Sequence, residues 1–238
     1  MKLPCLIILT ITALFISKAF GNDIQLDNRF FTVMNSALDI PYPRNIQRWM
    51  AMSLGEKKTN AQALYLLDVK ASETEGISNA VRLAVAASAI QTFGNYISVI
   101  PLTSHDFEDF TASSDLSAAL FLLDDSQKLL DRIPPREAYL NVGGPGVAAS
   151  GMDPSGVKDP KNRADYERRI AENNQATEEN NNRHRISVGI VSVKSSLHRN
   201  IPYLAREGKV GSYTNTIGAS SLPAAVKAEL LEGVIPNP

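Results

Sequence analysis

Apolar positions recur every three or four residues through most of this chain, which is the spacing of one face of an α-helix. Prolines or glycines stand near the ends of most of these stretches, where helices commonly stop. The pattern predicts an all-α fold, with a helical bundle in the N-terminal half, a Gly/Pro-rich linker, a long helix and a short C-terminal helix. The predicted helices cover residues 24–38, 45–54, 59–71, 78–100, 115–133, about 159–204 and 222–232.

The predicted helix over residues 78–100 is apolar or small on both faces, unlike its neighbours. No charged residue follows Arg82 as far as Ile100. A helix that is apolar all round belongs at the centre of a bundle or in a membrane. Several polar residues dilute this one, so we expect a buried central helix, capped by Ser78 and ended before Pro101, rather than a membrane span.

The two helices before it are expected to be only half buried. The helix over 59–71 has a narrow apolar stripe, and its charged neighbours, including Lys57 and Asp68, fall on the other side. We expect those charges to face solvent. The shorter helix before it should end at Gly55 and bury Trp49, the only tryptophan, between helices.

The second half opens with Asp159 and Pro160, an N-cap residue followed by a proline that suits the first helical turn. The helix that follows is very polar at first, and from Ile186 onward its apolar residues recur at helical spacing. Residues 186–190 also alternate with the period of a β-strand, but the longer helical pattern favours helix. We expect Pro202 to kink or end this helix.

Between the two halves lies a dense cluster of helix-breaking residues. Residues 134–160 contain five glycines and five prolines. They predict a linker over 134–158 that joins a helical bundle unit of residues 22–133 to a long-helix unit of residues 159–238. The glycines lack the Gly-Lys-Ser/Thr sequence of a phosphate-binding loop, so we expect no nucleotide and no other cofactor.

The N-terminus has the pattern of a secretory signal peptide. Lys2 precedes the uncharged run Leu3–Ile16, and small residues follow up to Gly21. We expect residues 1–21 to be removed, which places the protein in the periplasm or outside the cell and leaves no stable membrane span; the alternative is an uncleaved anchor. The only cysteine, Cys5, lies in this leader, so the mature chain would have no disulfide and no thiolate ligand.

The charge balance argues against a nucleic-acid partner, because the chain carries 24 basic and 25 acidic residues. The charges are nevertheless unevenly placed, with an acidic run over 103–131 and a basic run over 183–211. These runs are expected to be solvated faces or to pair across the fold. The alternative is an anion-attracting patch, for which Arg199 and Arg206 are the candidate binding residues.

One segment resembles a known group of sequences. Residues 159–167 read DPKNRADYE, and residues 170–174 read IAENN. This segment is similar to a helical segment of uncharacterised exported proteins of planctomycete-type bacteria, in which a Gly/Pro-rich loop precedes Asp-Pro and then Arg-Ala-x-Tyr-Glu. The resemblance implies a helix beginning at Asp159 and an envelope setting, and it implies no activity.

Catalytic signals are weak. The three histidines have no metal-ligand spacing, so no metal site is expected, and a Gly-x-Ser-x-Gly nucleophile motif is absent. His105 beside Asp106 is the one candidate base with an orienting group, although adjacent residues of a helix do not face each other. A surface histidine in an acidic turn over 105–109 is the simpler interpretation.

The sequence therefore favours a non-enzymatic structural or interaction protein of the cell envelope, whose partner would be another protein or an envelope component. Two alternatives remain open. One is a hydrolase of envelope polymers that uses His105, and the other is a small-ligand carrier with a pocket around residues 78–100.

Overall fold

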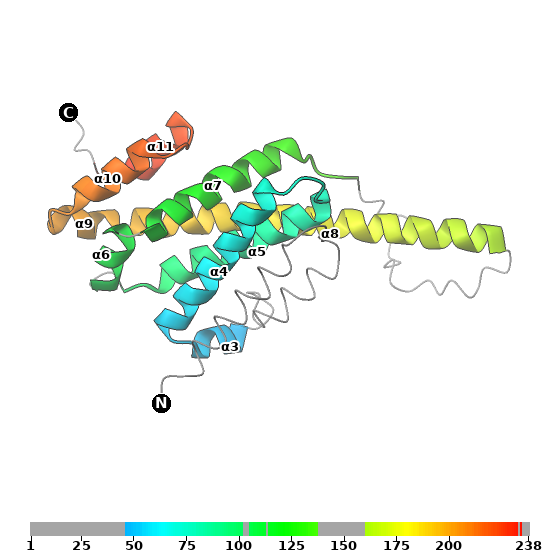
Figure 1. The fold of residues 1–238 in the computed structure, drawn as a ribbon, viewed down its shortest axis with the longest axis horizontal. Helices are drawn as coiled ribbons and strands as arrows, with labels where there is room; N and C mark the ends of the chain where they lie inside the picture. The colour runs from blue at the N-terminus through cyan, green and yellow to red at the C-terminus, as the bar shows by residue number, and fades with distance from the viewer. Residues whose placement is uncertain (1–45, 102–104, 113, 138–159, 233, 235–238) are drawn as a thin grey trace.

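The computed structural model of this chain describes residues 46–101, 105–112, 114–137, 160–232 and 234 (Figure 1). Every regular element in these ranges is an α-helix, so the predicted all-α fold is confirmed. The helix predicted over 24–38 and the signal peptide lie outside the described residues, as does the linker from residue 138 onward. The helices are α3 (Ile46–Ala51), α4 (Leu54–Glu73), α5 (Asn79–Val99), α6 (His105–Ala112), α7 (Ser114–Arg132), α8 (Pro160–Arg199), α9 (Ile201–Arg206), α10 (Val210–Ala219) and α11 (Ala224–Leu231).

Helix α5 is the centre of the fold, as its sequence predicts. Residues 81–90 are all buried, and α4, α7 and α8 pack around the helix. Ser78 is the N-cap, and its hydroxyl oxygen accepts a hydrogen bond from the backbone N–H of Val81 at 3.3 Å. The apolar side chains on all sides of α5 are therefore explained by helix partners rather than by lipid.

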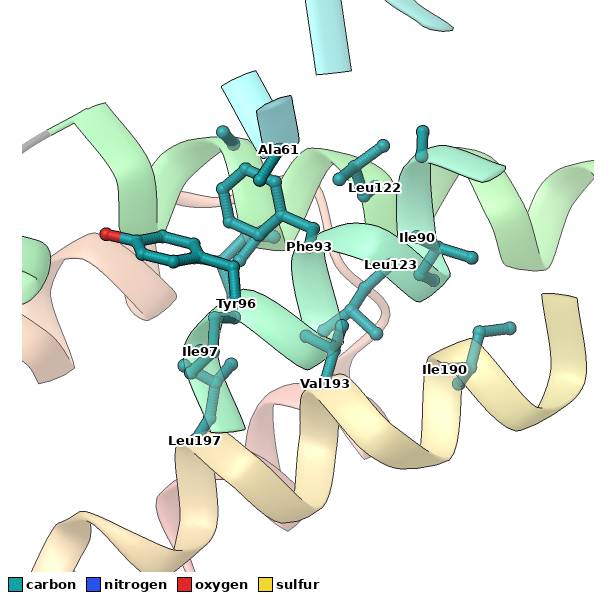
Figure 2. Packing of buried hydrophobic residues seen from close by; sticks show 14 of the residues in the cluster. Ala61, Ile90, Phe93, Tyr96, Ile97, Leu122, Leu123, Ile190, Val193 and Leu197 are labelled. Carbon is teal, nitrogen blue, oxygen red and sulfur yellow. The ribbon is translucent and has the colours of Figure 1, made fainter. Parts of the chain in front are cut away.

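The closest partner of α5 is the C-terminal half of α8. Hydrogen bonds join Arg185 Nε to Gln91 Oε1 at 3.0 Å and Arg199 Nη2 to the carbonyl oxygen of Ser98 at 2.9 Å. The residue numbers rise together on both helices, so α5 and α8 run parallel. Figure 2 shows Val193 and Leu197 of α8 next to α5.

Two glycines allow the axes of α5 and α8 to come close. A Cβ atom added at Gly189 of α8 would lie 2.6 Å from Ile90 Cγ2, and one added at Gly94 of α5 would lie 2.9 Å from Ser192 Oγ. Neither site has room for a methyl group without displacement of its neighbour. The glycines therefore act here as the smallest possible packing surface rather than as turn residues.

The two predicted units share one hydrophobic core. Phe93 and Leu123 from the first unit and Val193 from the second belong to the same cluster of buried residues (Figure 2). The chain after α7 is also fastened to α8, because Asn180 accepts from the backbone N–H of Arg136 at 3.1 Å and donates to its carbonyl oxygen at 2.7 Å. The Gly/Pro-rich stretch thus joins two units that pack together.

The beginning of α4 corrects two expectations. Ser53 and Glu56 form a capping box, so the helix starts at Leu54 and Gly55 lies in its first turn instead of ending the previous helix. Lys57 is buried rather than solvent-facing. Its ammonium group donates to the carbonyl oxygen of Met52 at 2.8 Å and lies 5.9 Å from the centre of the ring of Trp49, which is buried as expected.

Residues 105–112 also differ from expectation, because they form the helix α6 instead of an acidic turn. Phe107 and Phe110 are fully buried and stack with ring centres 5.8 Å apart. Two aromatic residues spaced by three positions alternate with the acidic residues of this segment. Burial of this pair is enough to hold a short helix on the core.

At the C-terminus, α8 ends at Arg199 and α9 begins at Ile201, so the long helix is broken near Pro202 as expected, and Pro202 lies in the first turn of α9. The helix α10 was not predicted. Its Tyr213 is buried and its hydroxyl donates to the carbonyl oxygen of Leu230 at 3.4 Å, which joins α10 to α11. Burial raises the pKa of this hydroxyl, so it stays protonated.

Candidate functional site

A buried cluster of three charged side chains lies where α4, α5 and α7 meet. The guanidinium of Arg82, in the first turn of α5, donates through Nη1 to Asp68 Oδ1 on α4 and through Nη2 to Asp125 Oδ2 on α7. The side chains of Asp68 and Arg82 are 0% and 5% exposed, and that of Asp125 is 21% exposed. The expectation that Asp68 faces solvent is therefore wrong, because Asp68 lies on the buried stripe of α4, four residues after Leu64 and three before Ala71.

The electrostatics of this cluster are dominated by burial. Desolvation raises the pKa of Asp68 to about 7, against the attraction of Arg82 and with the help of repulsion from Asp125. Burial lowers the pKa of Arg82, but the two carboxylates outweigh it and hold this pKa above its usual value. Asp68 Oδ2 is buried and has no hydrogen-bond partner among the described residues.

Other acidic residues of α7 are also used inside the fold. Asp115 accepts from Gln62 Nε2 at 2.8 Å and pairs with Lys58 at 2.8 Å, which fastens the start of α7 to α4. Asp124 pairs with Lys128 and accepts from the hydroxyl of Ser221, both at 2.7 Å. These members of the acidic run hold helices together instead of forming one solvated face.

The basic residues singled out from the sequence also make internal contacts. Arg199 donates to the carbonyl oxygen of Ser98 at the end of α5, a position where a cation compensates the helix dipole. Arg206 is exposed, with its guanidinium 5.6 Å from the ring centre of Tyr203 and Nε 3.6 Å from Glu207 Oε1. Arg199 thus has a structural role, whereas Arg206 presents its charge at the surface of α9.

The candidate catalytic pair lies at the start of α6, with His105 as its first residue and Asp106 as its second. Their side chains are outside what the structure describes. In an α-helix, the side chains of consecutive residues generally project about 100° apart.

The most exposed feature of the fold is the first part of α8. This helix has 40 residues, so it is about 60 Å long, and its N-terminal part extends beyond the other helices (Figure 1). None of the described side chains from Ala164 to Gln175 is buried. We call residues 160–175 the arm; it spans about 24 Å.

The arm is an uninterrupted continuation of a core helix. Arg168 and Glu172 pair along it at 3.3 Å, and Gln175 donates to Glu179 Oε1 at 2.9 Å. Glu179 in turn pairs with Arg136 at 3.3 Å, where the chain from α7 lies on α8. Local i,i+4 pairs therefore support the helix on the N-terminal side of this contact.

The described residues offer neither a metal-binding cluster nor a membrane-spanning helix. No group of three or more histidine, cysteine, aspartate or glutamate side chains there is arranged to hold a metal ion. Among the helices described, none is both long enough and apolar enough to cross a membrane.

Comparison with protein-family models, with curated proteins and with solved structures found no match to this chain.

The cluster of Asp68, Arg82 and Asp125 was not predicted from the sequence, although the sequence contains one signal for it. Arg82 is the only charged residue of the otherwise uncharged α5. A guanidinium in such a helix must be paired when it is buried. Its partners Asp68 and Asp125 lie 14 and 43 residues away in the chain, and only the packing of three helices identifies them.

Proposed function

We propose that this chain is an exported, non-enzymatic interaction protein of the cell envelope, and that it binds another envelope component through the arm. The observation that carries the proposal is the extension of α8 past the bundle as one helix, in which none of the described side chains from Ala164 to Gln175 is buried (Figure 1). Isolated helices are only marginally stable in water, so a long exposed helix needs an additional source of stability. Continuity with the buried half of α8 supplies that stability.

The shape of the arm suits binding rather than catalysis. A helix that is already formed loses little conformational entropy when a partner binds to it, which favours affinity. The arm presents both Arg168 and Glu172, so its surface is mixed in charge. We infer a partner with a polar surface, such as a protein, in preference to nucleic acid or the apolar interior of a membrane.

The setting rests on the leader and on the resemblance of the arm to segments of exported planctomycete-type proteins. Residues 1–21 are expected to direct export and then to be removed. The protein would then work in the periplasm or outside the cell.

Site-specific crosslinking in cells that naturally make the protein tests the proposal. A photoreactive amino acid is placed at Glu172 in the arm and, as a matched control, at Lys128, an exposed residue of α7. We expect one discrete adduct of higher mass from position 172 and none from position 128. A third position, Arg206, lies on α9 at the opposite end of α8 (Figure 1).

The pattern of adducts decides between surfaces. The same adducts from positions 172 and 128, or none from either, would contradict a specific contact through the arm. An adduct from position 206 alone would place the contact on α9, and the arm would then have no part in it.

A further inference from the structure

The cluster of Asp68, Arg82 and Asp125 is not balanced in charge. One guanidinium faces two carboxylates, so the cluster carries a net charge of −1 when both acids are ionised. An excess charge is costly in a site where two of the three side chains are almost completely buried. A single proton would make the cluster neutral.

Geometry selects Asp68 as the group that takes this proton. Its side chain is completely buried, whereas that of Asp125 is 21% exposed and keeps some contact with water. Arg82 occupies only one oxygen of Asp68, and Oδ2 has no hydrogen-bond partner among the described residues. A carboxylate oxygen without a donor is the natural place for a proton.

Other charged side chains on the surrounding helices have partners of their own. On α7, Asp124 pairs with Lys128, so these two neighbours compensate each other. On α8, Arg183 donates to the carbonyl oxygen of Leu130, and Arg185 donates to Gln91 and Asn182. The charges that shift the pKa of Asp68 most are those of Arg82 from α5 and Asp125 from α7.

We propose that Asp68, Arg82 and Asp125 form a proton-operated latch, which holds the α4–α5 hairpin on α7 while Asp68 is protonated and weakens this attachment when Asp68 ionises. The position of the cluster supports this role. Asp68 lies near the end of α4, and Arg82 lies in the first turn of α5. The cluster therefore connects both helices of the hairpin to α7 at positions close to the turn between them.

The direction of the pH dependence follows from proton linkage. The pKa of Asp68 is about 7 in the folded protein, and it is near 4 in an unfolded chain. The folded protein therefore binds a proton that the unfolded chain has released. The resulting stabilisation is fully present at acidic pH, below the unfolded pKa, and is lost as the pH rises through about 7.

Urea unfolding of the purified protein and of Asp68→Asn tests the latch. The asparagine keeps the shape of the protonated acid and cannot ionise. Between about pH 5 and pH 8, we expect the unfolding equilibrium constant of the wild type to rise on the order of 50-fold more than that of Asp68→Asn. The control Asp131→Asn, which removes an exposed carboxylate of α7, should keep the wild-type pH dependence.

A second measurement applies even if Asp68→Asn does not fold. The carboxyl carbon of Asp68 is followed by nuclear magnetic resonance in the wild type and in Asp125→Asn during a pH titration. We expect a midpoint near pH 7 in the wild type and a lower midpoint in Asp125→Asn, because the repelling carboxylate is gone.

Either measurement can overturn the proposal. Equal pH dependence of stability in the wild type and Asp68→Asn would show that Asp68 does not take up the proton. A wild-type midpoint near pH 4 would show that the cluster remains ionised and works as an ordinary ion pair.

Discussion

Replacement of Gly189 by alanine tests the contact between α5 and α8 that organises the core. The added Cβ would lie 2.6 Å from Ile90 Cγ2, 3.2 Å from the backbone nitrogen of Gln91 and 3.3 Å from the carbonyl carbon of Ile90. Carbon atoms pack comfortably at about 3.5–4.0 Å. Ile90 is fully buried and branched at Cβ, so its side chain cannot turn away freely. The two helices must therefore separate by roughly 1 Å.

The expected magnitude combines two opposing terms. Overpacking of a tight core costs about 1–3 kcal/mol. Alanine gains up to about 1 kcal/mol over glycine inside a helix. The matched control is Gly218→Ala in α10, where an added Cβ meets nothing within 4 Å. The control should stabilise the protein slightly, so we expect the two variants to differ by about 2 kcal/mol, with Gly189→Ala the less stable.

Urea unfolding at fixed pH and temperature measures this difference. The slope of free energy against urea should be the same for both variants, since the exposed area on unfolding is unchanged. A double-mutant cycle with Ile90→Ala adds specificity, because removal of the obstructing methyl group should relieve the clash by about 1 kcal/mol. If Gly189→Ala were as stable as Gly218→Ala, the close approach of α5 and α8 would be refuted.

Three further predictions concern the centre of the fold, the candidate base and export. Ile90→Asp should abolish cooperative thermal unfolding, because an unpaired buried carboxylate costs several kcal/mol, about the stability of a whole domain; wild-type melting would mean that Ile90 is exposed. His105→Ala should leave any envelope function unchanged, whereas a roughly 100-fold slower turnover with intact stability would establish an enzyme. Mass spectrometry of the periplasmic or secreted fraction should find a mature N-terminus near Asn22; an intact Met1 in the cytoplasm would contradict export.

The sequence predicted the elements whose signal is local. The uncharged stretch after Arg82 identified α5 as the central helix, and Asp159 with Pro160 placed the start of α8 within one residue. The boundaries of α7 were equally close, because prolines follow it directly. Periodicity, caps and breakers act over a few residues, so they can be read without knowledge of the fold.

Most of the incorrect sequence predictions concern features that depend on contacts between residues far apart in the chain. Asp68 was placed in solvent because it is charged, although it lies between Leu64 and Ala71 on the buried stripe of α4. Its buried partner, Arg82, lies on another helix. Helix α10 was missed because Gly211 and Gly218 lower its helix propensity, and packing of Tyr213 compensates for this. The Ser53–Glu56 capping box was a local signal that could have been recognised.

The proposed function depends most directly on the arm being a rigid continuation of the core half of α8. Distances between spin labels measure this, with Cys5 replaced by serine and labels at Ala171→Cys and Ser195→Cys, both exposed positions. The two labelled residues are 24 positions apart in the sequence. In a continuous helix they should therefore be separated by about 36 Å, with a narrow distribution of distances. The control pair, Asn181→Cys and Ser195→Cys, should give about 21 Å within the packed part of the helix. A broad or much shorter distance for the first pair, with the control distance intact, would contradict a rigid arm and the function proposed for it.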